Sequence, residues 1–298
     1  MRKQMKFKNM VAAVITAAIL ILTVLGYIFD AYDYLQSNLF GTAGYDDAYV
    51  EMLDVGQGDS ILLYSGGSAA LIDTGVKSYS DSIIKTAKLK GIDTLDVLLI
   101  THNHSDHMGG IVPLTEELKV NTLVIPDLNK TDERTDKMQT AIQNVKKQGG
   151  KVMTAKKGGS LEVGEFNITV LGAYYDQKDE NDRSIVTMAQ IGKWKFLFTG
   201  DAQEPIEKLL MKDNISLNCD VLKVGHHGSM YGTSEEFLEA CSPSFAMISC
   251  GKGNRYSHPH DVVLLRLKEA GAQYFRTDTN GNIIFKITEK EVIASTEK

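Results

Sequence analysis

The 298-residue sequence contains only three cysteines, and none of them belongs to a C-x-x-C pair. A disulfide framework needs several paired cysteines and a thiolate zinc site needs closely spaced ones, so the sequence argues against both. Cys219, Cys241 and Cys250 are therefore predicted to be buried small apolar residues. One disulfide stays compatible with an oxidising compartment, but the sequence does not identify its pair.

The chain also lacks an excess of positive charge. Its formal net charge is −6, and Arg2, Lys3, Lys6 and Lys8 contribute +4, so the other 290 residues carry −10. A domain of this charge has no overall basic field that attracts nucleic acid. Any anionic substrate must therefore be attracted by a local basic patch or by a bound cation, and metal ions would supply that charge.

One long uncharged apolar run, Val11–Phe29, follows the positive cluster. As a helix, these residues would rise about 28 Å, roughly the thickness of the hydrocarbon core of a bilayer. No A-x-A-like cleavage site follows, which favours an uncleaved signal anchor in residues 1–30 over a secretory signal that is removed. Because positive flanks stay cytoplasmic, we expect a single-pass protein of the cell membrane, with the rest of the chain outside the cytoplasm. The alternative is secretion after cleavage. The sequence implies no protein partner.

Residues 31–47 form a polar, glycine-containing linker, and residues 48–298 contain neither a Pro/Gly/Ser-rich linker nor an internal repeat. This predicts one domain over 48–298. Short β-rich runs separated by "GQGD" and "GGS" predict antiparallel strands over 48–74. Helices are expected at about 81–90, 112–119, 132–148, 204–211, 234–240 and 261–270. Strands interspersed with helices predict an α/β (α+β) fold, with sheets covered by helices on their outer faces.

All seven histidines fall in three short clusters, each at or near the end of a predicted strand. The first cluster is an H-x-H-x-D-H loop directly after the apolar strand "TLDVLLIT". A loop at a strand end lets successive side chains converge on one point, and imidazole and carboxylate are ligands of zinc, manganese and iron. The pattern therefore predicts a metal site, whose first candidates are His102, His104, Asp106 and His107.

Two further strand ends carry candidate ligands. Gly200-Asp201 follows "WKFLF", and "GHHGS", with His226 and His227, follows "DVLKV". An H-x-H-x-D-H loop, a later G-D and a later G-H, each after a strand, together resemble the metallo-β-lactamase superfamily. "LIDTG", with Asp73, is similar to the supporting aspartate motif of that superfamily. "LDVGQGDS", "NRYSHPH" and "TDTNG" narrow the resemblance to the hydrolase domain of ComEC competence proteins and their stand-alone relatives, over about residues 48–288.

This resemblance implies an αββα sandwich with two divalent metal ions, Zn or Mn, at one edge of the sheets. It implies that His102 and His104 bind the first ion, that Asp106 and His107 bind the second, and that Asp201 bridges them. We expect His226 to be the remaining ligand because it follows the strand and glycine directly. His227 would then either support a ligand from behind or face the substrate, and with Asp106 and Asp201 it is a candidate catalytic residue.

One part of the superfamily pattern is missing. The superfamily normally supplies a third histidine to the first metal, between the H-x-H-x-D-H loop and the G-D, but no histidine lies between His107 and His226. "NDRS" (Asn181 to Ser184) occupies that place. An oxygen ligand from Asn181 or Asp182 would favour manganese over zinc; alternatively, the first metal is weakly held.

The last histidine cluster, "YSHPH", has two interpretations. His258 and His260 would line the substrate cleft and donate to a phosphate or a leaving group, or they would cap the following helix in a loop fixed by Pro259. Asn254 and Arg255 beside them would add hydrogen-bond donors for an anionic substrate.

The expected reaction is hydrolysis by a hydroxide formed from metal-bound water. The resemblance to ComEC domains implies an extracytoplasmic phosphodiesterase or nuclease that acts on DNA and is associated with DNA uptake. Two alternatives stay open: a metallohydrolase of another small or envelope-derived substrate, such as a phosphoester, lactone or β-lactam, and a non-catalytic binding module on the same fold. With one predicted span, the chain has no room for the multi-helix channel of the full ComEC proteins.

Overall fold

The computed structural model describes residues 47–127, 133–213 and 215–298, which belong to one compact unit. The predicted membrane span at 11–29 and nearly all of the predicted linker lie outside the described residues. Within the described ranges, no helix has both the length and the apolar character that crossing a membrane requires.

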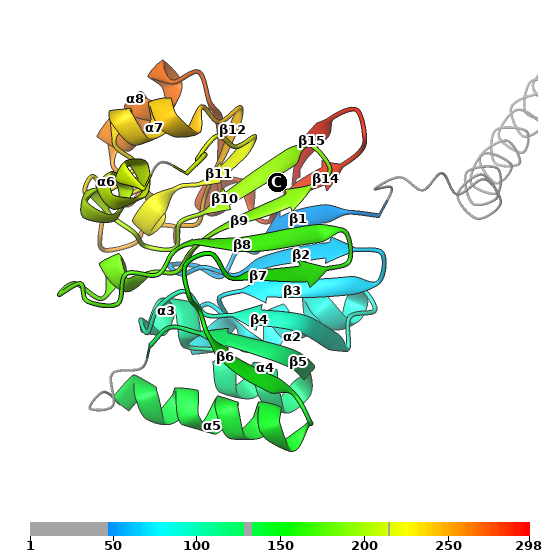
Figure 1. Cartoon of the computed structure of the whole chain (residues 1–298). Coiled ribbons are helices and arrows are strands. Elements are labelled where there is room, and N and C mark those ends of the chain that lie inside the picture. Colours follow the sequence, from blue (N-terminus) through cyan, green and yellow to red (C-terminus); the bar gives the residue numbers. More distant parts are fainter. Residues whose placement is uncertain (1–46, 128–132, 214) are drawn as a thin grey trace, which may run out of the picture. The chain divides into compact units, whose positions relative to one another are not determined.

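The first sheet has eight strands in the order β15-β14-β1-β2-β3-β4-β5-β6 (Figure 1). The antiparallel pairing of β1, β2 and β3 confirms the predicted strand meander, whereas β3 to β6 run parallel. The strands are β1 (Tyr49–Met52), β2 (Ile61–Ser65), β3 (Ser68–Ile72), β4 (Thr94–Leu99), β5 (Lys119–Ile125), β6 (Lys151–Thr154), β14 (Ile283–Ile287) and β15 (Val292–Thr296).

The second sheet has seven strands in the order β13-β12-β11-β10-β9-β8-β7. Its strands β7 to β10 are antiparallel, and β10 to β13 are parallel. They are β7 (Ser160–Val163), β8 (Phe166–Gly172), β9 (Val186–Ile191), β10 (Trp194–Phe198), β11 (Val221–Lys223), β12 (Phe245–Ile248) and β13 (Gln273–Arg276).

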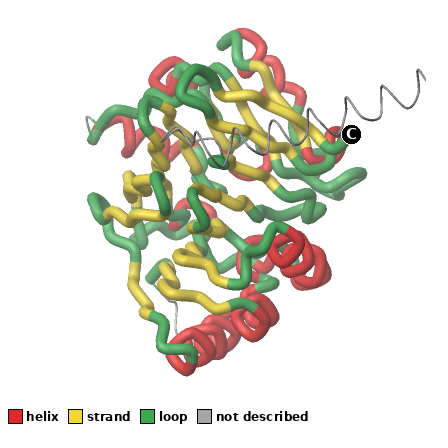
Figure 2. Tube along the Cα trace, turned by 90° about the vertical axis from the view of Figure 1, so that its right-hand side faces the viewer, coloured by secondary structure: helices red, strands yellow, loops and turns green. Residues whose placement is uncertain are grey.

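Helices cover the outer face of each sheet, so that strands form the middle of the molecule and helices its outside (Figure 2). On the first sheet these are α2 (Ser80–Leu89), α4 (Ile111–Glu117) and α5 (Glu133–Lys147), and on the second α6 (Glu204–Lys212), α7 (Glu235–Cys241) and α8 (Asp261–Glu269). The remaining short helical segments are η1 (Lys77–Tyr79), α3 (Ser105–Met108), η2 (Asn181–Arg183), η3 (Gly225–Gly228) and α9 (Thr277–Asn280). This is the αββα sandwich that the sequence predicted.

Three buried apolar layers hold the sandwich together, one between the sheets and one beneath each set of helices. Strand β4 shows why its sequence is continuously apolar: Val97 and Leu99 face the layer between the sheets, while Leu98 faces the helices. A strand that is buried on both faces needs apolar residues at successive positions. The three cysteines, all within the described ranges, are buried and unpaired, as predicted.

Candidate metal centre

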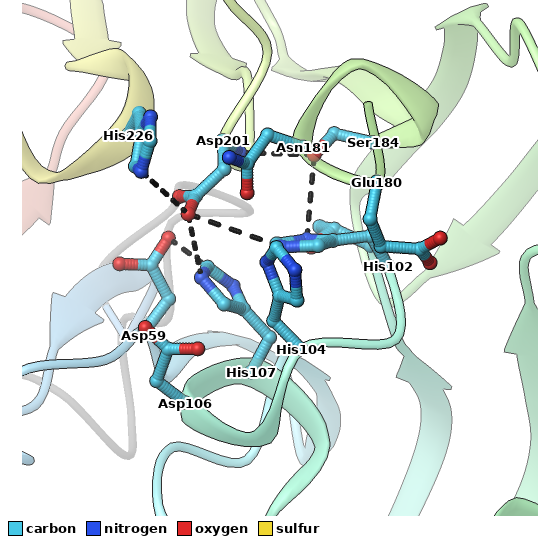
Figure 3. A network of polar contacts seen from close by, with 12 residues as sticks. Asp59, His102, His104, Asp106, His107, Glu180, Asn181, Ser184, Asp201 and His226 are labelled. Atoms are coloured by element: carbon cyan, nitrogen blue, oxygen red, sulfur yellow. Dashed lines mark hydrogen bonds and ion pairs between the residues drawn. The ribbon is translucent and has the colours of Figure 1, made fainter. Parts of the chain in front are cut away.

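The Asp201 carboxylate lies at the centre of a group of histidines that point toward it (Figure 3). Its Oδ2 atom lies 3.2 Å from His107 Nε2, 3.5 Å from His227 Nε2 and 3.9 Å from His102 Nε2. These side chains come from three strand ends, because His102 and His107 follow β4, Asp201 follows β10 and His227 follows β11. The sandwich thus brings together residues that are far apart in the sequence, at the carboxyl ends of strands in both sheets.

Glycines allow this close approach of loops. Gly200, directly before Asp201, has φ of +54°, and a Cβ atom there would lie 3.0 Å from the Ser184 Cβ atom. At Gly58 a Cβ atom would lie only 2.4 Å from the backbone oxygen of Asp106. A side chain at either position would push apart the loops that carry the candidate ligands.

His102, His104 and Asp201 form the first group of ligand atoms. His102 Nε2 and His104 Nδ1 lie only 3.0 Å apart, a separation that two ligands of one ion adopt. Asn181 lines the same cavity, and its buried Oδ1 atom has no hydrogen-bond partner among the described residues. Asp182 instead accepts a hydrogen bond from the Gln203 backbone N–H at 3.1 Å. Of the two oxygen ligands that the sequence left open, the structure brings Asn181 to the site.

Asp106, His107, Asp201 and His227 form the second group of ligand atoms. His227 Nε2 lies 3.4 Å from Asp106 Oδ2 as well as close to Asp201. The structure therefore places His227, and not the expected His226, within this group. Both residues have left-handed backbone conformations, with φ of 45° at His226 and 55° at His227, so the chain turns sharply and directs the second histidine inward. His226 instead lines the cavity, with its Nε2 atom 3.8 Å from Asp201 Oδ2.

Several buried polar atoms of these groups have no hydrogen-bond partner among the described residues. They are His107 Nε2, Asp201 Oδ1 and His227 Nε2. An unpaired buried polar atom costs free energy, and three of them so close together call for an explanation. Imidazole nitrogen and carboxylate oxygen are both ligands of divalent cations, so the residues present fit the two metal ions that the family resemblance implied.

Asp73 fixes the orientation of the metal loop. It accepts hydrogen bonds from the Thr101 backbone N–H at 2.8 Å and from the Thr101 hydroxyl at 2.7 Å, and its Oδ2 atom lies 2.7 Å from His107 Nδ1. When His107 Nδ1 carries the proton and donates to Asp73, the lone pair of His107 Nε2 faces Asp201 and the second group of ligands. Asp73 is therefore the supporting aspartate that the "LIDTG" motif suggested.

Two functional residues were missed by sequence reasoning, Asp59 of the "GQGD" turn and Lys223 at the end of β11. Lys223 Nζ lies 2.6 Å from Asp59 Oδ2, and Asp59 Oδ1 lies 3.4 Å from His227 Nδ1. Burial opposes ionisation of Asp59, but Lys223 and His107 together outweigh it and lower the pKa of this carboxyl. The sequence contained a signal for this ion pair. A lysine inside an apolar strand such as "DVLKVG" is rarely buried unless a carboxylate pairs with it.

The electrostatics of the cluster favour cations. Burial opposes the charging of His107, but Asp201 and Asp73 outweigh it and raise its pKa well above the usual range. For His227, burial is likewise outweighed by Asp201 and Asp106, and the pKa rises to about 9. Burial, with help from His107, lowers the pKa of His102 well below its usual value, which keeps this ring neutral. Because metal ions compete with protons for such nitrogens, the excess of carboxylate charge favours a bound cation.

A cavity of about 310 Å³ opens above the two groups of ligands. Sequence reasoning did not identify three of the residues that line it, Gln57, Ser105 and Tyr256. The full lining consists of Gln57, His104, Ser105, Asp106, Asn181, Asp201, His226, His227, Tyr256 and His258.

Of the four substrate-binding residues predicted in the 254–260 loop, His258 lines this cavity. The Asn254 amide instead braces the loop, donating to the backbone oxygens of Gly251 at 2.9 Å and His258 at 2.6 Å. Arg255 lies over the Tyr256 ring and donates to its hydroxyl at 2.6 Å. His260 precedes α8 but makes no side-chain capping bond to it; its Nδ1 atom accepts a hydrogen bond from the Met230 N–H at 3.0 Å. Of the two histidines of "YSHPH", only His258 has the predicted place at the cleft. His260 neither lines the cleft nor caps the helix.

Comparisons with known proteins agree with this geometry. The sequence model of the family described as "Metallo-beta-lactamase superfamily" matches residues 53–252. ComE operon protein 3 of Bacillus subtilis (strain 168) is 34% identical over 256 residues, which cover 80% of this chain and 33% of that protein. Competence protein ComA of Neisseria gonorrhoeae is 29% identical over 242 residues, covering 80% of this chain and 32% of that protein. Both are ComEC-like competence proteins, and the chain spans about a third of the length of these curated relatives.

A solved structure supports the fold itself. The metallo-beta-lactamase fold protein YhfI from Bacillus subtilis superimposes with a TM-score of 0.54 at 15% identity, covering 80% of this chain and all of that one. At this identity the likeness concerns the fold alone.

Proposed function

This chain belongs to the metallo-beta-lactamase superfamily, and on that basis we propose that it is a metal-dependent phosphodiesterase that cleaves DNA. The observation that carries the proposal is the sharing of Asp201 by two groups of ligand atoms at the base of one cavity. Two cations side by side suit attack on a phosphodiester, because they stabilise both the attacking and the leaving oxygen. The ComEC-like relatives favour DNA as the substrate, and the proposal concerns this domain alone, since it spans only a third of their length.

When bound, two divalent cations would lower the pKa of water and stabilise the negative charge that develops at phosphorus. His102, His104, Asn181 and Asp201 would hold one of them, and Asp106, His107, His227 and Asp201 the other. This exchanges the roles that the sequence suggested for His226 and His227, because His227 has the inward position. An oxygen ligand at Asn181 makes manganese the favoured ion of the first site.

Residues of the cavity wall would handle the protons. Asp106 belongs to the second group of ligand atoms and also lines the cavity, where its carboxylate can orient the attacking water. Water adds to phosphorus, the bond from phosphorus to the leaving oxygen breaks, and that oxygen takes up a proton. The products are a phosphomonoester and a free hydroxyl. His226 lines the cavity, and burial lowers the pKa of its ring, so this neutral imidazole can take up the proton of the attacking water and pass it to the leaving oxygen.

The test uses the full purified chain with manganese or zinc. Single-stranded DNA, double-stranded DNA, bis-p-nitrophenyl phosphate and nitrocefin are assayed side by side for the wild type, Asp201→Asn and Asp81→Asn. Asp81 is an exposed carboxylate in the first turn of α2 and is the matched control. DNA cleavage that Asp201→Asn loses and Asp81→Asn keeps is the expected result. Turnover of nitrocefin without cleavage of any phosphodiester would favour the alternative metallohydrolase, and no turnover with either metal would favour a binding module.

We further propose that the apolar run at 11–29 anchors the domain at the outer face of the cell membrane. Protease added to intact spheroplasts should then degrade the domain, and a lysed sample should show the same pattern. Protection in intact spheroplasts with degradation after lysis would place the domain on the cytoplasmic side.

A further inference from the structure

The cavity lining combines polar side chains, among them Ser105 and Asn181, with aromatic rings that follow one another from the ligand groups to Tyr256. The rings of His227 and His258 lie 6.3 Å apart with an interplanar angle of 29°, and those of His258 and Tyr256 lie 5.6 Å apart at 25°. A nearly parallel series of rings therefore connects the metal centre with the surface.

The series ends in exposed apolar surface. Tyr256 is 47% exposed although it lines the cavity. Tyr256 is therefore an aromatic side chain at the cavity with nearly half of its surface open to a ligand.

We propose that this ring wall, Tyr256 backed by His258, stacks a nucleobase next to the phosphodiester that is cleaved; this inference rests on the proposed function and deepens it. The ligand groups would take the phosphate, and the ring wall would take the base. Arg255 lies over part of the Tyr256 ring, with its guanidinium Cζ 4.8 Å from the ring centroid, and donates to the Tyr256 hydroxyl, so the guanidinium and the ring together offer planar groups to a base. Guanidinium planes as well as aromatic rings stack on bases.

The chemistry of the ring wall favours a nucleobase over other apolar groups as its ligand. An acyl chain needs a deep apolar channel, whereas this wall consists of flat rings at the surface with polar nitrogen and hydroxyl edges. A stacked base also needs no cationic groove. That fits a chain of net charge −6, because stacking is sequence-tolerant and adds affinity without phosphate contacts. The bases of an intact duplex are already stacked on each other, so the proposal selects unpaired nucleotides near the scissile bond.

The experiment uses the full chain and compares two single-stranded oligonucleotides as substrates. One has normal bases, and the other has abasic tetrahydrofuran residues at the same positions. The variants are Tyr256→Ala, Tyr256→Leu, Tyr256→Phe and the remote control Tyr274→Ala on β13. We expect Tyr256→Ala and Tyr256→Leu to lower kcat/KM for the base-bearing strand by about 10- to 100-fold, with little change for the abasic strand. Tyr256→Phe keeps the ring but loses the hydroxyl that accepts from Arg255, so it should retain most of the preference for bases, whereas Tyr274→Ala should resemble the wild type. An equal preference for bases in Tyr256→Leu and the wild type would overturn the proposal.

A binding measurement keeps this inference separate from the proposed function. In the Asp201→Asn background, a single-stranded oligonucleotide that contains 2-aminopurine should lose fluorescence on binding, because stacking quenches the base, and Tyr256→Leu should restore that fluorescence. If no phosphodiester is cleaved but quenching depends on Tyr256, the proposed function fails and the stacking site stands. If DNA is cleaved but quenching is the same with and without Tyr256, the stacking site fails alone.

Discussion

Lys223 Nζ lies 2.6 Å from Asp59 Oδ2, and both side chains are excluded from solvent. The same ammonium donates to the backbone oxygen of Gly200 at 2.9 Å, directly before the central carboxylate of Asp201. Asp59 belongs to the turn between β1 and β2 of the first sheet, whereas Gly200 follows β10 and Lys223 ends β11 of the second. One buried cation therefore joins the two sheets directly behind the metal ligands.

Replacing this lysine should be strongly destabilising. Lys223→Met leaves the Asp59 carboxylate buried without its counter-charge, and removal of one partner of a buried pair typically costs about 3–5 kcal/mol. The measurement is the free energy of unfolding in urea with metal chelated. The control is Lys88→Met, because Lys88 pairs with Glu117 at 2.9 Å on the exposed surface, where an ion pair contributes little. Equal stability of the two variants would show that Lys223 and Asp59 are not coupled as the structure indicates.

The two adjacent histidines should differ in metal content. His227→Ala removes a ring nitrogen that lies within the second group of ligands, so the variant should retain one equivalent of metal fewer than the wild type after dialysis. His226→Ala removes a cavity-lining ring outside that group and should keep the full content while losing activity. Inductively coupled plasma mass spectrometry measures both. The opposite pattern would restore the assignment of His226 that the sequence suggested.

Local patterns allowed much of this fold to be predicted. The apolar run of β4 followed by H-x-H-x-D-H gave both a buried strand and the loop at its end, and the G-D after β10 supplied the shared carboxylate Asp201. Each of these signals lies within about ten residues and depends on backbone geometry that sequence patterns report well.

The remaining part of the site depends on contacts that no local pattern contains. His226 and His227 are neighbours of the same type, and only their left-handed backbone angles decide which one faces inward. To predict the pairing of Lys223 with Asp59, one must know that the end of β11 lies next to the turn between β1 and β2 of the first sheet. Asn254 is polar and close to the cavity, yet its amide is used within its own loop, so residue type alone could not predict that its donors are occupied.

The metal preference of the first site should change when its missing histidine is supplied. Asn181→His places a third imidazole beside His102 and His104, and nitrogen ligands favour zinc over manganese. We expect the ratio of bound zinc to bound manganese, after equilibration with equal concentrations of both ions, to rise above that of the wild type. Asn167→His, at an exposed position of β8 that does not line the cavity, is the control. An unchanged ratio in Asn181→His would remove Asn181 from the ligand set.

Glu207 should make the stability of the protein depend on pH. This carboxylate in α6 is buried and accepts hydrogen bonds from the backbone N–H groups of Thr233 and Ser234, which follow the His226–His227 turn. Burial raises its pKa above the ordinary value of 4.5, and the backbone hydrogen bonds offset this only in part. The folded state therefore binds this proton more tightly than the unfolded state does. The resulting stability is fully present below pH 4.5 and is lost as pH rises through the folded-state pKa.

Urea unfolding of the metal-free protein from pH 4 to pH 8 measures this effect when the wild type is compared with Glu207→Gln. Glutamine keeps the size of the side chain but does not titrate, so the unfolding free energy of the wild type should fall relative to that of the variant as pH rises. Glu239→Gln, on the exposed face of α7, should have the pH profile of the wild type. Parallel profiles for the wild type and Glu207→Gln would mean that this carboxyl titrates alike in the folded and unfolded states. The loop after His227 would then be held by its hydrogen bonds at every pH, without the loss that burial of the charge predicts.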